Sequence, residues 1–263
     1  MQEESGEILL SAQRFLKRAN EIIDAGNSRQ IPIRLMGFLA FIRHCPKYSI
    51  WYEKMGRIVT DIDLVCLNKH RNQVEEVLIS KGYVLNVTDG MGLEMDRIMA
   101  NDEKDDVHID VFVDKLSMCH EINFKNRLEI DNPTIPLADM LLEKMQIVRI
   151  NEKDIKDVII LLREHAVEQD KNQEAVDTRY VAQLLAKDWG FYHTVEKNLA
   201  LVKEHLDRYD VLSQDDKQDV REKVDAVLKS MKGEPKGMKW QMRAKLGESS
   251  KWYNDVEDVM RDE

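Results

Sequence analysis

Three aspartates in two short segments have the type and spacing to hold a divalent metal ion. Residues 60–65 read TDIDLV and residues 108–113 read HIDVFV. Both segments alternate as β-strands do, so Asp61 and Asp63 point to one face, while the apolar residues of the second segment leave Asp110 on its other face. Carboxylates gathered in this way repel one another unless a cation lies between them, and divalent cations serve phosphoryl-transfer chemistry. The two segments therefore predict a metal site made of Asp61, Asp63 and Asp110.

The length, charge and cysteine content of the chain limit the classes of protein to which it can belong. The chain has 263 residues, enough for one large domain or two modest ones with a hydrophobic core. Its net charge of −10 argues against a nucleic-acid binder that uses its whole surface, but is compatible with a local basic patch. The cysteines, Cys45, Cys66 and Cys119, lack ligand spacing and are expected as core thiols in a reducing cytoplasm. Because we find no secretory signal and no run of about 20 apolar residues, we predict a cytoplasmic protein without a membrane span.

Apolar periodicity and turn residues predict an α/β (α+β) fold, with a mixed β-sheet core flanked by helices and followed by an all-helical C-terminal domain. The predicted strands are residues 31–36, 59–67, 83–87, 93–100 and 107–113, with a turn at 90–92 and a hairpin between the last two. The predicted helices of the first part are residues 6–25, the start of 38–56, 69–81, 136–150 and 152–165. A polar stretch after residue 165 predicts three parts: an N-terminal helix (1–29), a core (30–165) and a helical domain (166–263).

Three features occur in a fixed order: a strand leading into Gly37, then Asp61 and Asp63, then Asp110 on a later strand. In this respect the chain resembles the nucleotidyltransferase superfamily. Residues 35–40 (LMGFLA), Arg57 and residues 60–64 (TDIDL) are similar to two of its branches, the small-molecule (antibiotic) nucleotidyltransferases and the prokaryotic AbiEii-like group, some of whose members act as toxins. In a later stretch the chain resembles the AbiEii-like group more closely. The residues that carry this resemblance are 141–144 (LLEK), Arg149, Lys153, Asp154 and Asp157. The resemblance covers about residues 30–165.

The resemblance implies a magnesium-dependent nucleotidyltransferase. Asp61 and Asp63 would hold two Mg²⁺ ions against a nucleoside triphosphate, and Asp110 would complete a metal site or accept the proton of the attacking hydroxyl. Gly37 would let the backbone approach a phosphate closely. The reaction would transfer a nucleoside monophosphate to a hydroxyl acceptor, with pyrophosphate leaving. An RNA end, a protein side chain and a small molecule all fit as the acceptor.

The residue directly after Gly37 differs from the family pattern, and this difference motivates an alternative function. The family usually has a second small residue directly after the first glycine, whereas this chain has Phe38. A phenyl ring supplies no hydroxyl and restricts the backbone of the phosphate-binding turn. The alternative is a non-catalytic nucleotide-binding or regulatory module, such as one partner of a toxin–antitoxin pair.

Further residues are candidates for binding the nucleotide or for lining the site. Arg57 either binds a phosphate or pairs with a neighbouring carboxylate, and Lys144 is a candidate phosphate ligand. Thr60, in the acidic strand, and Phe38, in the turn after Gly37, are further candidates for binding the nucleotide. His108 shares a face with Asp110, where it either lines the site or serves a structural role. We expect Lys153, Asp154 and Asp157 of the later helix to form ion pairs on the helix surface, and their match to the family pattern makes them secondary candidates for the site.

The C-terminal segment 232–253 interleaves cations with aromatic residues. Its cations are Lys236, Lys239, Arg243, Lys245 and Lys251, and its aromatic residues are Trp240, Trp252 and Tyr253. Single-stranded nucleic-acid surfaces combine these residue types, because rings stack on bases while cations pair with phosphates. The alternative, which we favour, is a helix whose aromatic side chains pack onto the rest of the protein while its charges lie in water.

Overall fold

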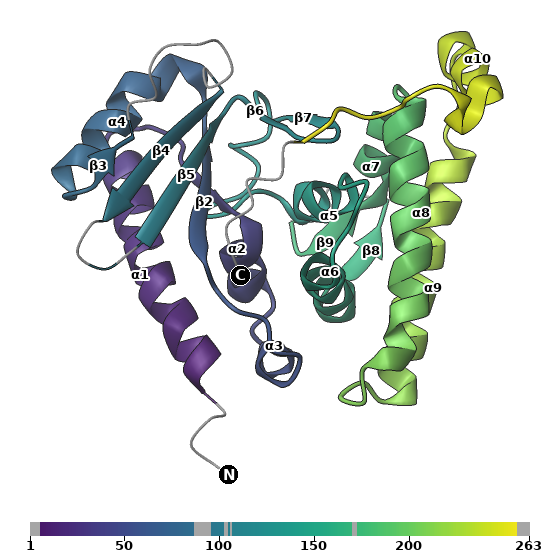
Figure 1. The fold of residues 1–263 in the computed structure, drawn as a ribbon, viewed down its shortest axis with the longest axis horizontal. Coiled ribbons are helices and arrows are strands. Elements are labelled where there is room, and N and C mark those ends of the chain that lie inside the picture. Colours follow the sequence, from purple (N-terminus) through teal and green to yellow (C-terminus); the bar gives the residue numbers. More distant parts are fainter. Residues whose placement is uncertain (1–5, 87–95, 103–104, 106, 170–172, 257–263) are drawn as a thin grey trace.

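The five-stranded sheet is mixed and has helices beside it, and it lies in one half of the molecule, with α5 to α10 in the other (Figure 1). The computed structural model describes residues 6–86, 96–102, 105, 107–169 and 173–256. The strand order is β1-β2-β5-β4-β3, with bounds Arg34–Met36, Asp61–Cys66, Val107–Val113, Arg97–Asp102 and Val84–Leu85. β2 and β5 are parallel, whereas the other neighbouring pairs are antiparallel. The predicted mixed α/β class is confirmed, as is the antiparallel pairing of the strands near 97–102 and 107–113. The predicted turn at 90–92 lies outside the described residues.

Two helices cover one face of the sheet. α1 (Glu7–Ser28) and α4 (Arg71–Ser80) lie against each other, and α1 also contacts β1 and β2. Both helices bury apolar side chains at helical spacing: Ala12, Phe15, Ala19, Ile22 and Ile23 in α1, and Val74, Val77 and Leu78 in α4. Ile79, which the periodicity also predicts in the apolar stripe of α4, is exposed instead. The sheet contributes alternate apolar residues of its central strands, among them Ile62, Leu64, Ile109 and Val111. Because side chains on a strand alternate between faces, the aspartates of β2 and β5 are left on the opposite face.

The next helices come after the edge strand β1 and after loops later in the chain. α2 (Gly37–His44) begins directly after β1 and contacts β2, α5 (Leu137–Met145) and α6 (Glu152–Glu164). α3 (Ile50–Lys54) contacts α1, and a 3-10 turn at Asn68–His70 precedes α4. α6 begins at a cap that Asn151 provides, since its side chain accepts a hydrogen bond from the backbone N–H of Asp154 at 2.9 Å. This cap separates α5 from α6, as the predicted break near residue 151 requires.

The segment from residue 166 onward is not all helical, so this part of the prediction is wrong. It begins with two short parallel strands, β8 (Ala166–Glu168) and β9 (Ala175–Asp177). Short strands of three residues carry too little alternation to be recognised in a polar stretch. An antiparallel pair, β6 (Lys115–Ser117) and β7 (Glu121–Asn123), also escaped prediction. The helices that follow are α7 (Thr178–Leu185), α8 (Trp189–His205), α9 (Gln214–Gly233) and α10 (Met238–Leu246), with 3-10 turns at Leu206–Arg208 and Gly247–Ser249.

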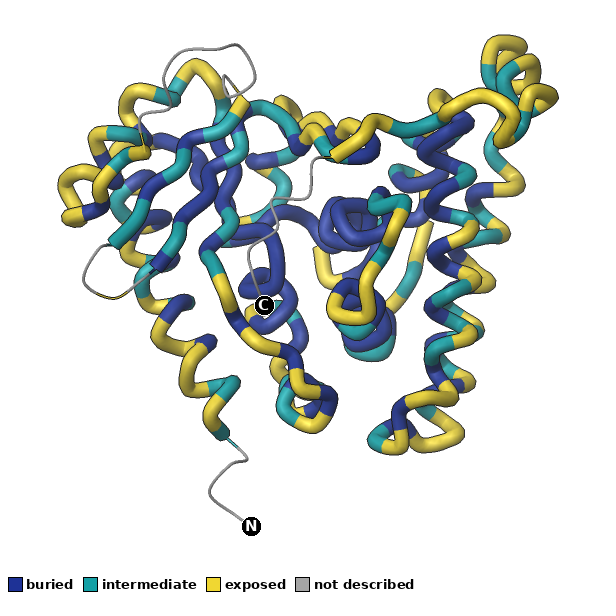
Figure 2. The backbone as a smooth tube through the Cα atoms, viewed as in Figure 1, coloured by how far each residue is buried: buried dark blue, intermediate teal, exposed yellow. Residues whose placement is uncertain are grey.

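The buried apolar side chains form one continuous cluster from Ala12 to Met231, on both sides of residue 165 (Figure 2). α5 and α6 contact α8, and α6 also contacts α9, so the helices on either side of the predicted boundary pack together. The three cysteines are buried and form no disulfide, as predicted for core thiols. Within the described residues, no helix is both long enough and apolar enough to cross a bilayer.

Candidate metal centre

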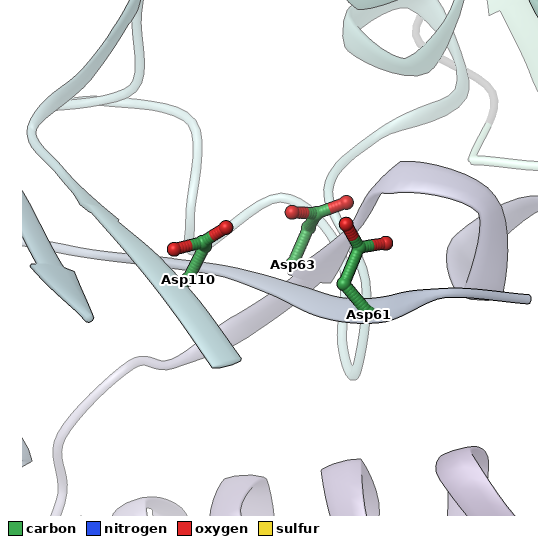
Figure 3. A group of neighbouring side chains, drawn as sticks. All are labelled: Asp61, Asp63 and Asp110. Carbon is green, nitrogen blue, oxygen red and sulfur yellow. The ribbon is translucent and has the colours of Figure 1, made fainter. Parts of the chain in front are cut away.

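The parallel pairing of β2 and β5 brings the three predicted aspartates together. Asp63 lies opposite Asp110 in the register of the two strands, and Asp61 lies opposite His108. One carboxylate oxygen from each of Asp61, Asp63 and Asp110 lies within 4.8 Å of those of the other two, and the three side chains converge on one face of the sheet (Figure 3). A donor set made only of carboxylate oxygens suits a hard divalent cation. The predicted grouping of these residues is confirmed, and the group could bind a metal.

The electrostatics of this acid cluster favour a bound cation. Burial raises the pKa of Asp63 well above its usual range, and the neighbouring carboxylates of Asp61 and Asp110 raise it further. The Lys144 ammonium acts in the opposite direction but does not offset these effects. Thr60 lies beside the cluster, where its hydroxyl donates a hydrogen bond to Asp61 Oδ1 at 3.0 Å. A cation at the cluster would relieve the repulsion that raises the pKa of Asp63.

An arginine that the sequence analysis did not identify reaches the cluster. Arg97, at the start of β4, donates a hydrogen bond to Asp110 Oδ2. Its guanidinium also lies 5.0 Å from the ring centroid of Phe112. The antiparallel register places Arg97 opposite Phe112 and Met99 opposite Asp110, on the same face as the aspartates. The ion pair of Arg97 with Asp110 depends on the register between β4 and β5. No local sequence pattern around Arg97 shows that register.

His108 shares the face of the cluster, as predicted from strand alternation. Its Nδ1 lies 2.7 Å from Asn101 Oδ1, and Asn101 is its register partner on β4. This contact fixes the ring on the sheet, two residues along β5 from Asp110 and opposite Asp61 on β2.

Gly37 is required by its backbone conformation and by the space that Asp63 fills. Its φ is +65°, in the left-handed region that favours glycine, and a Cβ added there would lie 2.1 Å from Asp63 Oδ2. The Gly37 N–H donates to Glu143 Oε2 at 3.3 Å. The group that lies close to Gly37 in the structure is a carboxylate of the cluster, and the approach of a phosphate to this glycine stays a prediction. α2 begins at this glycine, so the positive end of the helix lies beside Asp63.

Phe38 does not point toward the cluster as a ligand would. Its ring is buried, meets Tyr52 edge to face at a centroid distance of 4.9 Å, and has the guanidinium of Arg57 3.9 Å from its centroid. Phe38 therefore serves as a core residue that supports Arg57.

Arg57 and Lys144 belong to a buried ion network between α2, α5 and α6. Arg57 Nε and Nη2 donate to the two carboxylate oxygens of Asp157 at 3.2 and 3.3 Å. Lys144 Nζ lies 3.1 Å from Asp154 Oδ1 and 3.3 Å from Asp157 Oδ2. Of the two alternatives for Arg57, the structure shows the pairing with a carboxylate.

The prediction that Asp154 and Asp157 form ion pairs on the helix surface is wrong. Both side chains are buried beneath Arg57 and Lys144, and only Lys153 of the three predicted surface residues is exposed. Burial disfavours a charged lysine, but the carboxylates of Asp154 and Asp157 outweigh it and raise the pKa of Lys144. The charge pattern of α6 alone does not reveal burial, because the covering cation, Arg57, lies 100 residues away from Asp157.

Glu143 joins the ion network to the turn at Gly37, and the sequence analysis did not identify this role. Burial raises its pKa to about 7, although Lys144 and the N–H of Gly37 both favour the charged form. Glu143 Oε1 is buried without a hydrogen-bond partner and lies 4.0 Å from Lys144 Nζ. The available signal was an acidic residue directly after the apolar residues 140–142 of α5, where burial of a charge is costly.

No protein-family model matches this chain, and a search of curated proteins returns no match. The function must therefore be argued from the site itself.

Proposed function

We propose that this chain transfers a nucleoside monophosphate from a nucleoside triphosphate to a hydroxyl acceptor, with a requirement for Mg²⁺. The observation that supports the proposal is the convergence of Asp61, Asp63 and Asp110 beside the glycine-led start of α2. Oxygen ligands for a divalent cation, next to a helix start that favours a phosphate, are the elements that phosphoryl transfer needs.

In this reaction the acceptor oxygen forms a bond to the α-phosphorus, and the bond from that phosphorus to the bridging oxygen breaks. Pyrophosphate leaves with the electron pair, and the proton of the acceptor hydroxyl passes to Asp110. Asp61 and Asp63 would hold the metal, which supplies positive charge against the triphosphate. Gly37 positions Asp63 and allows α2 to begin at the site, while Thr60 orients the carboxylate of Asp61 through its hydrogen bond.

Arg57 and Lys144 enter this proposal as positioning residues. Lys144 also attracts the negative charge of Asp63 through space, so it lowers the repulsion in the cluster. Their direct partners are Asp154 and Asp157, which hold them in place through buried ion pairs. RNA, a protein side chain and a small molecule remain as acceptors, and the net charge of −10 favours a cationic small molecule or a protein over a polyanion.

A specific observation favours a second function, that of a non-catalytic nucleotide-binding or toxin–antitoxin-type module. Phe38 is buried under Arg57 and offers no hydroxyl to a phosphate, and Arg57 and Lys144 are already neutralised by Asp154 and Asp157. A triphosphate would then meet fewer cations than a transferase usually presents. This function predicts metal binding without transfer.

Thermal unfolding with each nucleoside triphosphate, with and without Mg²⁺, tests the site, and transfer of an α-phosphate label tests the reaction. A ligand present at about 100 times its dissociation constant stabilises the folded state by about 2.7 kcal/mol. For a chain of this size the midpoint should rise by about 5–10 °C. A magnesium-dependent shift with label transfer supports the transferase, and a shift without transfer to any acceptor class supports the non-catalytic module. Full transfer by the Asp61→Asn, Asp63→Asn variant would falsify the proposed role of the cluster.

A further inference from the structure

The helix α10 presents different side chains on its two sides. Met238, Met242 and Leu246 recur every four residues, and their exposed fractions are 78%, 61% and 56%. Trp240 lies on the opposite side of the helix, where it packs against the protein. An apolar stripe of this kind on an exposed helix side is unusual, because soluble proteins rarely leave neighbouring large apolar side chains in water.

The aromatic side chains of this segment are already engaged with α8 and with the end of α7. Trp240 Nε1 donates to the carbonyl oxygen of Leu185 at 3.2 Å, and its ring meets Tyr192 edge to face at 5.3 Å. Trp252 Nε1 donates to Thr194 Oγ1 at 3.1 Å. The packing alternative predicted for residues 232–253 is therefore the one that the structure shows. These rings cannot stack on bases without leaving their partners.

Lysines flank the apolar stripe on both sides. Lys239 and Lys245 are exposed, and neither has an ion pair within the described residues. Residues 229–251 contain seven lysine and arginine residues against two glutamates, in a chain whose net charge is −10. Lys251 pairs with Asp255, so among the described residues the positive charge without an ion pair beside the stripe is that of Lys239 and Lys245.

A hollow lies beside α10 on the side that carries Trp240, and none of the three stripe residues lines it. Its volume is about 570 Å³, and it is lined by residues of α7, of α10 and of the link between α9 and α10, among them Ala186, Lys187, Glu234, Pro235, Lys239 and Trp240. Lys239 belongs both to this hollow and to the border of the stripe. We name the hollow and the stripe Met238, Met242 and Leu246 together the α10 surface. It lies on the helical side of the molecule, away from β2 and β5 (Figure 1).

We infer that the α10 surface binds an acidic amphipathic helix of a partner protein. The exposed methionines and leucine fit the apolar side of such a helix, and methionine adapts to partners of varied shape. Lys239, Lys245 and Lys187 match its acidic side.

Other occupants fit these features less well. A nucleic acid would use the lysines but gain nothing from aliphatic side chains, which do not stack on bases. A second copy would need about 800 Å² per partner, far more than three side chains and one hollow supply. A flat lipid surface would leave the hollow unfilled.

A synthetic peptide tests the inference with the full chain. The probe is a fluorescein-labelled helical peptide with Leu at heptad positions a and d and Glu at the polar positions. Two control peptides are matched in length, one with the same residues shuffled so that it has no apolar side, and one with Lys in place of Glu. Anisotropy should rise with the acidic amphipathic peptide, rise at least tenfold more weakly with the controls, and weaken in higher salt.

Paired variants locate the binding. Met238→Glu with Met242→Glu, and separately Lys239→Glu with Lys245→Glu, should each weaken peptide binding at least tenfold without changing the thermal midpoint, because all four side chains are exposed. Ile79→Glu on α4 and Lys69→Glu are the matched controls, since both residues are exposed outside the α10 surface. These controls should bind the peptide as the unchanged chain does.

Each contrary result overturns the inference. Equal binding of all three peptides, no binding of any, or unchanged binding by the paired variants shows that the α10 surface does not recognise an acidic helix. Methionine-dependent binding to anionic vesicles without peptide binding assigns the surface to a membrane. Lysine-dependent binding of single-stranded RNA that ignores the methionines assigns it to nucleic acid, and a dimer dissociated by Met242→Glu assigns it to a second copy.

Discussion

The acid cluster on the sheet and the ion network between α2, α5 and α6 are both made of charged residues, but their charges are balanced differently. In the network, Arg57 and Lys144 alternate with Asp154 and Asp157, and each cation contacts a carboxylate within 3.3 Å. In the cluster, Asp61, Asp63 and Asp110 meet within 4.8 Å, and Arg97 forms an ion pair with Asp110.

This difference distinguishes a region that stabilises the fold from a region that could bind a metal and carry out chemistry. A network that satisfies its own charges contributes to the fold and needs no ligand, whereas a cluster of like charges stabilises a state in which a cation is bound. The raised pKa of Asp63 shows that repulsion and burial dominate at the cluster. A carboxylate whose pKa is raised by like charges beside it is a candidate for function, whereas network residues whose partners carry the opposite charge are expected to act on stability.

We expect the largest effect of a substitution at the acid cluster. Asp63→Asn should reduce label transfer by at least about 10³-fold, because a charge that holds the metal and stabilises the transition state is lost. It should also abolish the metal-dependent thermal shift while raising the midpoint of the metal-free protein, because one of the repelling carboxylates becomes neutral. Activity and unfolding assays of one preparation measure both. Glu76→Gln, on the exposed side of α4, should change neither quantity.

The network should respond in the opposite way. Asp157→Ala removes the partner of Arg57 and one partner of Lys144 and leaves buried cations uncompensated, so it should destabilise the fold by about 3–5 kcal/mol. Urea unfolding measures this loss, and the metal-dependent shift should persist at temperatures where the variant is folded. Adding Arg57→Leu to Asp157→Leu should recover part of the stability lost by Asp157→Leu alone. A metal shift abolished by a folded Asp157 variant would contradict the separation of the two regions.

Glu143 lies between the two regions and should give the fold a pH dependence. Its pKa rises from 4.5 in an unfolded chain to about 7 in the folded protein, so between these values the folded state binds more protons. Stability from this group is present below pH 4.5 and is lost as the pH rises toward 7, by on the order of 3 kcal/mol. Glu143→Gln keeps an acceptor for the Gly37 N–H and removes the charge. Urea unfolding at pH 5, 6, 7 and 8 should show a flatter profile for this variant and higher stability at pH 8. A slope equal to that of the unchanged chain would locate the titration elsewhere.

Local patterns predicted the side-chain directions of the acid cluster but not its surroundings. Alternation placed Asp61 and Asp63 on one face of their strand and Asp110 on the face of its strand away from the apolar residues, because that period belongs to the strand itself. The two faces coincide because β2 pairs with β5, a neighbourhood that the family resemblance implied and alternation alone does not. The pairing of Arg97 with Asp110 depends on the register between β4 and β5, and the burial of Asp154 and Asp157 depends on Arg57 from a distant segment. The strands β8 and β9 are too short to show a period. Long-range contacts of these kinds leave no mark in a local sequence pattern.

The smallest predicted effect concerns Arg97, which occupies Asp110 Oδ2 when no metal is bound. A metal ion and this guanidinium compete for the same carboxylate, so Arg97→Ala should bind Mn²⁺ or Mg²⁺ about three- to tenfold more tightly, as expected when the partly exposed arginine gives up an ion pair worth about 1 kcal/mol with the buried Asp110 carboxylate. Titration calorimetry on the nucleotide-free protein measures the affinity, and Arg97→Lys should fall between the two. Arg29→Ala, which removes an exposed arginine after α1, controls for net charge. Weaker metal binding by Arg97→Ala would mean that the arginine organises the cluster rather than competing for it, and the contrast between a balanced network and an unbalanced cluster would then be smaller than the pKa of Asp63 indicates.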